Sequence, residues 1–290
     1  MRTNEVAYWN VQMMKRWRKG PALLAARDLE AFWDGRTNAV EQEASDPSFL
    51  DYAAALVGCI QAKARPLPTD TGLELGVGTG SLALPLARRL SSVTVCDASE
   101  QMLQRVSAEA RQEGLAPIGA VHRRWMDVMP YRDIGAHDIV IAHRSLELIA
   151  CDRSGSPNFV DCIAKMDQLT RRAAFIIPQA FSLPDDGEFR ALFPECMGGP
   201  PVRFSDLTTL NLLSAMGLCP RLEYVSIRKT HQFRSIDEEV AAFRHFFRLD
   251  GVRRLKRLGE YLAKSATRQS HGYSLRTVTK AMVMWWPKEP

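Results

Sequence analysis

The chain has 290 residues, of which 46% are hydrophobic and 24% are charged, and its formal net charge is +5 at pH 7. This composition is typical of a globular protein and excludes collagen-like, coiled-coil and wholly disordered chains. The longest apolar runs, residues 82–87 and 173–178, are far shorter than the roughly 20 residues of a membrane-spanning helix. Residues 21–26 are too short for the apolar part of a secretory signal, so we expect a cytoplasmic protein.

Cysteines and basic residues bear on cofactors and partners. The six cysteines show no CxxC pair and no closely spaced Cys/His set, so we expect neither a disulfide framework nor a metal. Residues 251–280 contain eight Lys and Arg against the single acid Glu260, and residues 15–19 are a second small basic cluster. Both flanks of the chain could therefore face something anionic.

The first 66 residues read as helices. Residues 4–17, 22–33 and 49–64 have apolar positions at a spacing of three and four, and Pro66 and Pro68 end the third segment. We expect an N-terminal helical cap over residues 1–66, followed by one larger domain over residues 67–290.

Strands alternate with helices in the next hundred residues. Short apolar or β-branched runs at residues 72–76, 92–96, 119–122, 138–142 and 173–178 predict strands. The segments between them, residues 81–90, 99–113, 144–149 and 158–170, predict helices. This alternation predicts an α/β fold with a doubly wound, mostly parallel sheet that is covered on both faces.

The regular alternation of predicted strands and helices ends after residue 180. Residues 181–203 are rich in Pro and Gly, residues 205–216 predict a helix, and residues 222–233 predict a long strand. Residues 236–266 read as helical, and residues 277–286 are the final strand. A helical insertion at about residues 236–272 thus interrupts a hairpin before the last strand, and connections of that length are usually functional.

A glycine-rich loop gives the sharpest local signal. Glu74 is followed by Gly76, Gly78 and Gly80 at every second position, directly after a predicted strand and before a predicted helix. Glycines there let the backbone approach a ligand, and the free N–H groups of the helix start can face a polar or anionic group. Ser81 stands where a dinucleotide fingerprint has its third glycine, and the loop has no lysine, which excludes a phosphate-binding Walker loop.

An acidic residue ends the next strand. Asp97 lies about twenty residues after Gly76, where a carboxylate can accept both ribose hydroxyls of a bound nucleoside. The alternative is that Asp97 only caps the helix that follows. Asp127 comes after the third strand.

Together these motifs resemble the class I S-adenosylmethionine-dependent methyltransferases, most clearly over residues 70–180. The residues that carry the resemblance are Glu74, Gly76, Gly78, Gly80, Asp97, Ser99, Met102, Leu103 and Asp127, followed by the strand at residues 137–142. The resemblance implies a Rossmann-like fold with S-adenosylmethionine as cofactor.

The resemblance also implies a role for each matching residue. Glu74 and the backbone of the three loop glycines would hold the methionine part of the cofactor, and Asp97 would take the ribose hydroxyls. Met102 or Ala98 would pack on the adenine, and Asp127 with the backbone of Met126 would bind its amino edge. His143 and Arg144, after the fourth strand, would lie where the methyl group is presented, and we name them as catalytic candidates.

The transfer itself needs alignment more than covalent help, because a sulfonium methyl is already activated. A base is required only for an acceptor whose proton has a high pKa. His143, His231 and His245 are the candidates, each of which could instead be a structural or surface histidine. Trp9, Trp17 and Trp33, with Phe243, Phe246 and Phe247, could form an aromatic lid over the acceptor or a core seam; we favour the seam.

The sequence after the fourth strand and the basic residues near the C-terminus bear on the identity of the methyl acceptor. The fourth strand is followed by residues 142–145, Ala-His-Arg-Ser, and not by the Asn-Pro-Pro-Tyr type of turn common in base-modifying and protein-glutamine enzymes. We therefore expect a small, anionic acceptor, attracted by Arg253, Arg254, Lys256 and Arg257 unless these only form a solvated helix face. An RNA methyltransferase, and a cofactor-binding subunit or sensor without catalysis, remain alternatives; Ser81 disfavours a nicotinamide oxidoreductase.

Overall fold

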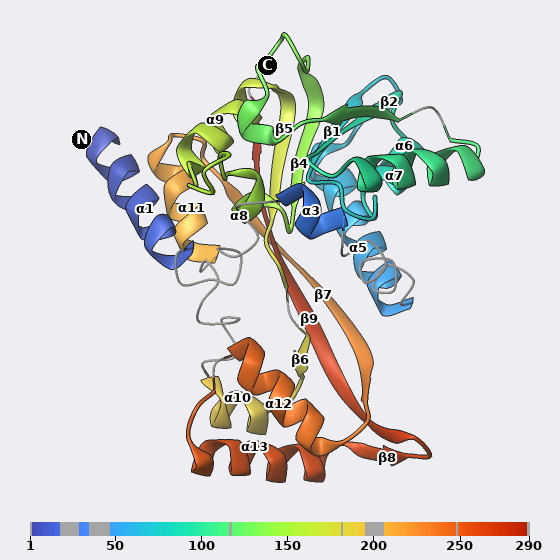
Figure 1. Cartoon of the computed structure of the whole chain (residues 1–290), viewed down its shortest axis with the longest axis vertical. Coiled ribbons are helices and arrows are strands. Elements are labelled where there is room, and N and C mark those ends of the chain that lie inside the picture. Colours follow the sequence, from blue (N-terminus) through green and yellow to red (C-terminus); the bar gives the residue numbers. More distant parts are fainter. Residues whose placement is uncertain are drawn as a thin grey trace.

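A nine-stranded sheet organises the chain in this computed structural model, which describes residues 2–17, 29–34, 47–115, 118–180, 182–194, 206–247 and 249–288 (Figure 1). Its order is β3-β2-β1-β4-β5-β9-β6, and β7 and β8 also pair with β9. The first five strands are parallel: β1 (Thr71–Leu75), β2 (Ser92–Asp97), β3 (Gly119–His122), β4 (His137–His143) and β5 (Thr170–Ile177). The antiparallel strands are β6 (Ser182–Pro184), β7 (Arg221–Phe233), β8 (Thr267–Gln269) and β9 (Gly272–Pro287).

Helices cover both faces of the parallel strands, and alternate strand residues belong to two separate cores. One core packs under α5 (Pro47–Ala64), α6 (Ala83–Ala87) and α7 (Glu100–Gln112), with α3 (Leu29–Asp34) against α7. The other packs under α9 (Phe159–Gln168), α11 (Asp206–Ala215) and α1 (Arg2–Trp17). Strands buried on both faces read as continuous apolar runs, which is why the sequence located them. The expected doubly wound, Rossmann-like α/β fold is confirmed.

The N-terminal helices divide between the two faces. Met13 of α1 is fully buried and Trp9 packs beside it, in the core under α9 and α11. Trp33 of α3 packs in the opposite core, under α5 and α7. The first part of the second predicted helix, residues 22–28, lies outside the described residues. In the described ranges no helix has the length and apolar character needed to cross a bilayer.

A separate lobe extends from the sheet along the long β7–β9 hairpin (Figure 1). We call it the distal lobe; it consists of β6, α10 (Gly187–Leu192), α12 (Ile236–Phe247), α13 (Val252–Ser265), β8 and the lower part of β7 and β9. It has a hydrophobic core of its own, in which Phe189, Phe243 and Tyr261 pack together. The helical insertion predicted before the last strand is therefore present. It is broken into two helices at Gly251, whose φ is +100°.

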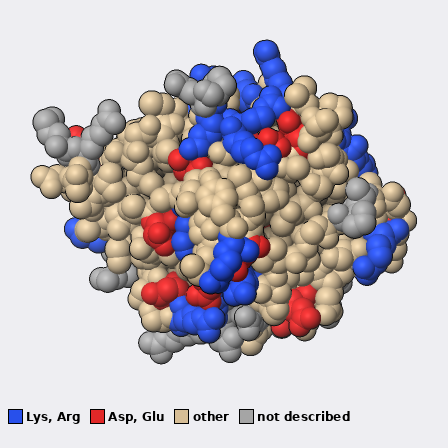
Figure 2. All heavy atoms as spheres, turned by 90° about the horizontal axis from the view of Figure 1, so that it is seen from above, with Lys and Arg blue, Asp and Glu red and all other residues tan. Residues whose placement is uncertain are grey.

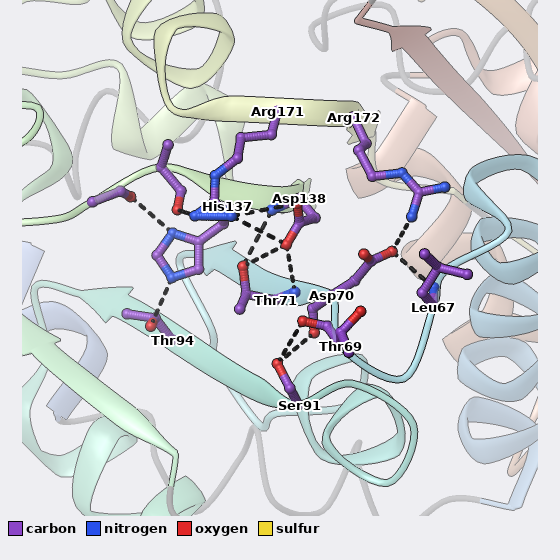
Figure 3. Close-up of polar contacts among 12 residues, drawn as sticks. Leu67, Thr69, Asp70, Thr71, Ser91, Thr94, His137, Asp138, Arg171 and Arg172 are labelled. Carbon is purple, nitrogen blue, oxygen red and sulfur yellow. Dashed lines mark hydrogen bonds and ion pairs between the residues drawn. The ribbon is translucent and has the colours of Figure 1, made fainter. Parts of the chain in front are cut away.

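The amino end of the parallel sheet holds a dense polar network (Figure 3). The Asp138 carboxylate accepts hydrogen bonds from the Thr71 backbone N–H at 2.8 Å and from the Thr71 hydroxyl at 2.9 Å, and Arg171 lies 3.4 Å away. Both ring nitrogens of His137 have partners, the Gly135 carbonyl at 2.8 Å and the Thr94 hydroxyl at 2.9 Å. Seen from this end, several groups of Lys and Arg have Asp or Glu beside them, and others at the edges of the view do not (Figure 2).

Candidate active site

The three glycines of the loop after β1 have different neighbours. All three have positive φ, +70° at Gly76, +52° at Gly78 and +75° at Gly80. A Cβ on Gly76 would lie 2.5 Å from Cβ of Ser145, and one on Gly80 would lie 2.9 Å from a methyl of Val106. A Cβ on Gly78 would meet nothing within 4 Å. Gly76 and Gly80 are thus required by packing, whereas Gly78 exposes its backbone to open space.

Glu74 is a buried carboxyl group directly before this loop. Its side chain leaves the sheet on the face opposite Leu73 and Leu75, and the residue is 2% exposed. Its Oε2 atom has no hydrogen-bond partner among the described residues. Burial raises the pKa of Glu74 to about 8; the Ala83 N–H lowers it and the charge of Asp97 raises it. A buried oxygen without a partner is costly, and such groups are uncommon outside functional sites.

Asp97 faces the same loop from the end of β2. Its carboxylate accepts hydrogen bonds from the Ser99 N–H at 2.9 Å and from the Gly78 N–H at 3.4 Å. Burial raises the pKa of Asp97, while these N–H groups lower it. Ser99 caps α7 by accepting from the Met102 N–H, and its hydroxyl donates to Asp34 of α3. Because Ser99 serves as the helix cap, Asp97 keeps its carboxylate at the loop.

The residues assigned to the adenine lie further along the same edge. Ala98 is partly exposed, and its carbonyl lies 2.9 Å from Nε2 of His122. Met102 is 1% exposed and packs in the core under α7, so of these two residues only Ala98 has surface to offer a ring. The Met126 carbonyl accepts from Lys165 at 2.7 Å, and Asp127 pairs with Arg153 at 2.9 Å.

His143 and Arg144 end β4, beside the loop. His143 is buried against the Tyr52 ring of α5, with 5.9 Å between ring centroids, and its Nε2 has no partner among the described residues. Burial, together with the Arg144 charge, lowers the pKa of His143 to about 3, so the imidazole is neutral at physiological pH. It can accept or donate a hydrogen bond, but it is a weak base.

Arg144 has a strained backbone and a fixed side chain. Its φ is +58°, a conformation that only a few per cent of non-glycine residues adopt. Its Nε donates to Oε1 of Gln179 at 2.6 Å, and its guanidinium carbon lies 5.6 Å from the centre of the Phe49 ring. The guanidinium is therefore held at the carboxyl edge from both sides, by a residue after β5 and by one in α5.

The structure thus brings together the loop, Glu74, Asp97, His143 and Arg144 at the carboxyl ends of β1, β2 and β4, the edge where open α/β sheets bind ligands. His231 lies elsewhere: it pairs with Glu239 in the distal lobe, at 3.1 Å, and His245 is exposed on α12 of the same lobe. Phe243 and Phe247 pack in the core of the distal lobe, away from Trp9 and Trp33. These aromatic residues form core seams and not one lid; the side chains of Trp17 and Phe246 lie outside the described residues.

Three residues of this edge, Phe49, Tyr52 and Gln179, were missed by the sequence analysis; they hold Arg144 and His143. The hydroxyl of Ser145, which follows these two residues, donates to the Leu75 carbonyl at 2.6 Å beneath the glycine loop. Gln179 follows a predicted strand and could have been found by its position. Phe49 and Tyr52 carry no such signal, because on α5 they read only as the apolar face of a helix.

Comparison with known proteins places this domain in a family. The sequence model of the family described as "Methyltransferase domain" matches residues 73–172. An uncharacterized protein of Haemophilus influenzae is 28% identical over 166 residues, 56% of this chain and 56% of that protein. The 23S rRNA (uracil(1939)-C(5))-methyltransferase RlmD of Tolumonas auensis is 38% identical over 64 residues, 22% of this chain and 14% of that protein. The chain therefore spans about half the length, or less, of these curated relatives.

Solved structures with this architecture are similar but distant. A putative methyltransferase of Bacillus halodurans has a TM-score of 0.49 at 14% identity, over 81% of this chain and 99% of that one. The N-methyltransferase NodS of Bradyrhizobium japonicum has a TM-score of 0.45 at 11% identity, over 85% of this chain and 99% of that one. The match to the family model thus identifies residues 73–172 of this chain, which include the glycine loop, as a methyltransferase domain.

Proposed function

We propose that the chain transfers a methyl group from S-adenosylmethionine to a small, anionic acceptor by in-line displacement. The observation that supports this best is the pair of carboxyl groups, Glu74 and Asp97, beside the open backbone at Gly78. Neither carboxyl forms an ion pair with a described residue. A ligand that brings positive charge and hydroxyl groups fits this site, because it would supply a counter-charge and a partner for Oε2 of Glu74.

Each residue then has a binding role. Glu74 and the backbone of residues 76–80 would hold the methionine part, Asp97 the ribose hydroxyls, Ala98 the adenine ring, and Asp127 with the Met126 backbone the adenine amino edge. The bound cofactor supplies an activated methyl group, so the chain has to align the acceptor and exclude water. Met102 is assigned to the support of α7, since its side chain is in the core.

Arg144 is the charge that we assign to an anionic acceptor. Gln179 and Phe49 already fix its guanidinium, so little side-chain entropy is lost when an anion binds. His143 would position the acceptor through a hydrogen bond from its neutral ring, because a group with a pKa of about 3 abstracts protons poorly. This arrangement suits an acceptor that reacts without prior loss of a tightly held proton.

Isothermal calorimetry with S-adenosylmethionine and its demethylated product tests the cofactor assignment. The wild-type chain should bind both, and Asp97→Ala should weaken binding about ten- to a hundredfold, the cost of roughly 1.5–3 kcal/mol for a hydrogen bond to a charged group. Asp133→Ala is the matched control, because Asp133 also accepts a backbone N–H, from Met129 at 2.9 Å, but lies away from the loop. Equal binding by wild type and Asp97→Ala, or tight NADH binding, would refute the assignment.

An RNA acceptor is the second candidate, supported by the stretch of sequence similar to the rRNA enzyme RlmD. A cofactor-binding subunit without catalysis is the third. Incubation with radiolabelled cofactor separates the three: label in small-molecule extracts supports the first, label in RNA the second, and cofactor binding without transfer to either fraction the third.

A further inference from the structure

The outer face of α13 is crowded with cations. Its exposed charged residues are Arg253, Arg254, Lys256, Arg257, Glu260 and Lys264, and Arg268 is exposed on β8 directly after the helix. The opposite side of the helix carries Leu258, Tyr261 and Leu262, which are buried in the core of the distal lobe. The helix is therefore apolar on its inner face and strongly basic on its outer face.

This arrangement is unfavourable for an isolated helix. The first turn of α13 contains no acidic residue, and Gly251 at its start provides no side-chain cap. Arg253 and Arg254 thus lie at the positive end of the helix dipole, and Arg253 repels Arg257 one turn on. The neighbouring α12 follows the usual pattern, with acids in its first turn and Arg244 and His245 in its last. A helix that departs from this pattern points to a functional constraint.

Carboxylates of the chain pair with two cations of this face, Lys256 with Glu260 at 3.9 Å and Lys264 with Glu188 at 2.7 Å. Some exposed arginines elsewhere are paired as well, as Arg88 is with Glu113 at 2.6 Å and Arg132 with Asp133 at 3.0 Å. Within the described ranges, Arg253, Arg257 and Arg268 form no ion pair. Three exposed arginines without an ion pair to a described residue thus lie together at one end of the distal lobe.

We propose that the outer face of α13, together with Arg268, is a docking surface for the phosphodiester backbone of RNA. Arginine binds phosphate oxygens with two parallel hydrogen bonds, and a row of cations on one helix matches a polyanion. A bilayer fits less well, because the apolar side of α13 is already used in the core and Val252 is the large apolar side chain that the helix exposes. Helical RNA is recognised mostly by its shape and backbone, which suits a surface whose exposed polar groups are nearly all cations.

The position of this surface goes beyond the proposed methyl transfer. α13 lies at the end of the distal lobe that is farthest from the parallel strands, and α10 and α12 lie nearer to those strands (Figure 1). An anion bound on its outer face cannot at the same time contact Arg144 unless it is an extended chain. The surface therefore does not serve a small acceptor, as the sequence alone had suggested, and RNA docking needs neither cofactor nor acceptor.

Fluorescence anisotropy with the full-length chain and a labelled RNA hairpin of about thirty nucleotides tests the proposal. Affinity should fall about fifty- to a hundredfold between roughly 50 and 200 mM salt, the dependence expected for about four phosphate contacts. The triple variant Arg253→Gln, Arg257→Gln and Arg268→Gln should bind at least tenfold more weakly at low salt, with a salt slope shallower by about two to three units. All three side chains are exposed, so circular dichroism and melting should show an intact fold.

The matched control replaces three exposed but ion-paired arginines, Arg88, Arg132 and Arg190, by Gln. It removes the same net charge and should change RNA affinity less than twofold, which separates a local surface from a general charge effect. Absence of RNA binding by the wild type, or equal losses in both triple variants, would overturn the proposal. Tighter binding to duplex DNA, to anionic vesicles or to poly-glutamate at equal salt would also overturn it, in favour of that partner.

Discussion

The two ends of the parallel sheet hold buried polar side chains of the same kinds, but these side chains differ in whether they have hydrogen-bond partners. At the amino end, His137 has a partner at both ring nitrogens, and Asp138 accepts two hydrogen bonds from Thr71. At the carboxyl end, Oε2 of Glu74 and Nε2 of His143 have no partner among the described residues. A satisfied network stabilises the fold, whereas a costly unsatisfied one indicates a place prepared for a ligand. The difference predicts that substitutions at the two ends have separable effects.

The largest effect should come from Gly78→Val. The added side chain would enter the open space beside the loop, so cofactor binding should fall more than a hundredfold while the fold survives. A β-branched residue at φ +52° costs about 1–3 kcal/mol of strain, so a modest loss in melting temperature is expected. Gly76→Val is the comparison: it collides with Ser145 and should unfold the domain. Calorimetry and far-UV circular dichroism of both variants distinguish a ligand space from a packing requirement.

Glu74→Gln should stabilise the ligand-free protein at neutral and higher pH. A folded-state pKa near 8, raised from 4.5, means that wild type and variant are about equally stable below pH 4.5, and that the wild type loses stability relative to the variant as the pH rises from 4.5 towards 8. The difference should reach on the order of 3 kcal/mol above pH 7 and vanish near pH 4. Melting of wild type and variant across this range measures it. A difference that does not change with pH would mean that the Glu74 carboxyl titrates normally.

Asp138→Ala should destabilise the fold by about 2 kcal/mol without changing cofactor affinity, since it removes the acceptor of two hydrogen bonds far from the loop. The Thr71 hydrogen bonds and the charges of Arg171 and Arg172 lower the pKa of Asp138 despite partial burial. Its contribution is therefore present above pH 4 and lost as pH falls through the lowered pKa. Denaturant titrations at pH 7 and pH 3 check both statements; weaker cofactor binding in this variant would contradict the separation of the two ends.

The smallest effect concerns the pH profile of methyl transfer. The His143 ring is already neutral at every pH well above its pKa of about 3. The pH profiles of wild type and His143→Gln should therefore have the same shape near pH 6.5, with no inflection that depends on His143. Single-turnover rates of both proteins between pH 5 and 8 measure this. An inflection near 6.5 that depends on His143 would show that the ring is solvated and protonated in the working enzyme.

The sequence predicted the parallel strands and the glycine loop. Period and β-branching located the five parallel strands to within three residues at each end, and the glycine spacing located the loop, because these signals are local. The helix–strand segment at residues 182–192 was missed, since its elements are short and surrounded by Pro and Gly. The sequence also predicted one helix over residues 236–266, although Gly251 divides it.

Contacts between distant segments could not be predicted in this way. Nothing local indicates that Gln179 reaches Arg144 across 35 residues, or that Arg144 adopts a positive φ. Likewise the residue types alone do not reveal that His137 is satisfied and His143 is not, because both are histidines at the ends of the same strand. The distinction arises from which side chains the folded sheet brings to each end.

The register of the β7–β9 hairpin has a consequence for how this fold can diversify. Phe233, at the end of β7, pairs with Tyr273 of β9, so the two ends of the segment at residues 234–272 lie side by side. Gly272 makes this closure possible: its φ is +135°, and a Cβ there would lie 2.3 Å from the Phe233 carbonyl oxygen. A segment whose two ends meet can be exchanged for another of different length without moving the strands that carry it. Evolution can thus replace α12 and α13 together with another segment, while the glycine loop and its carboxyl groups keep their positions.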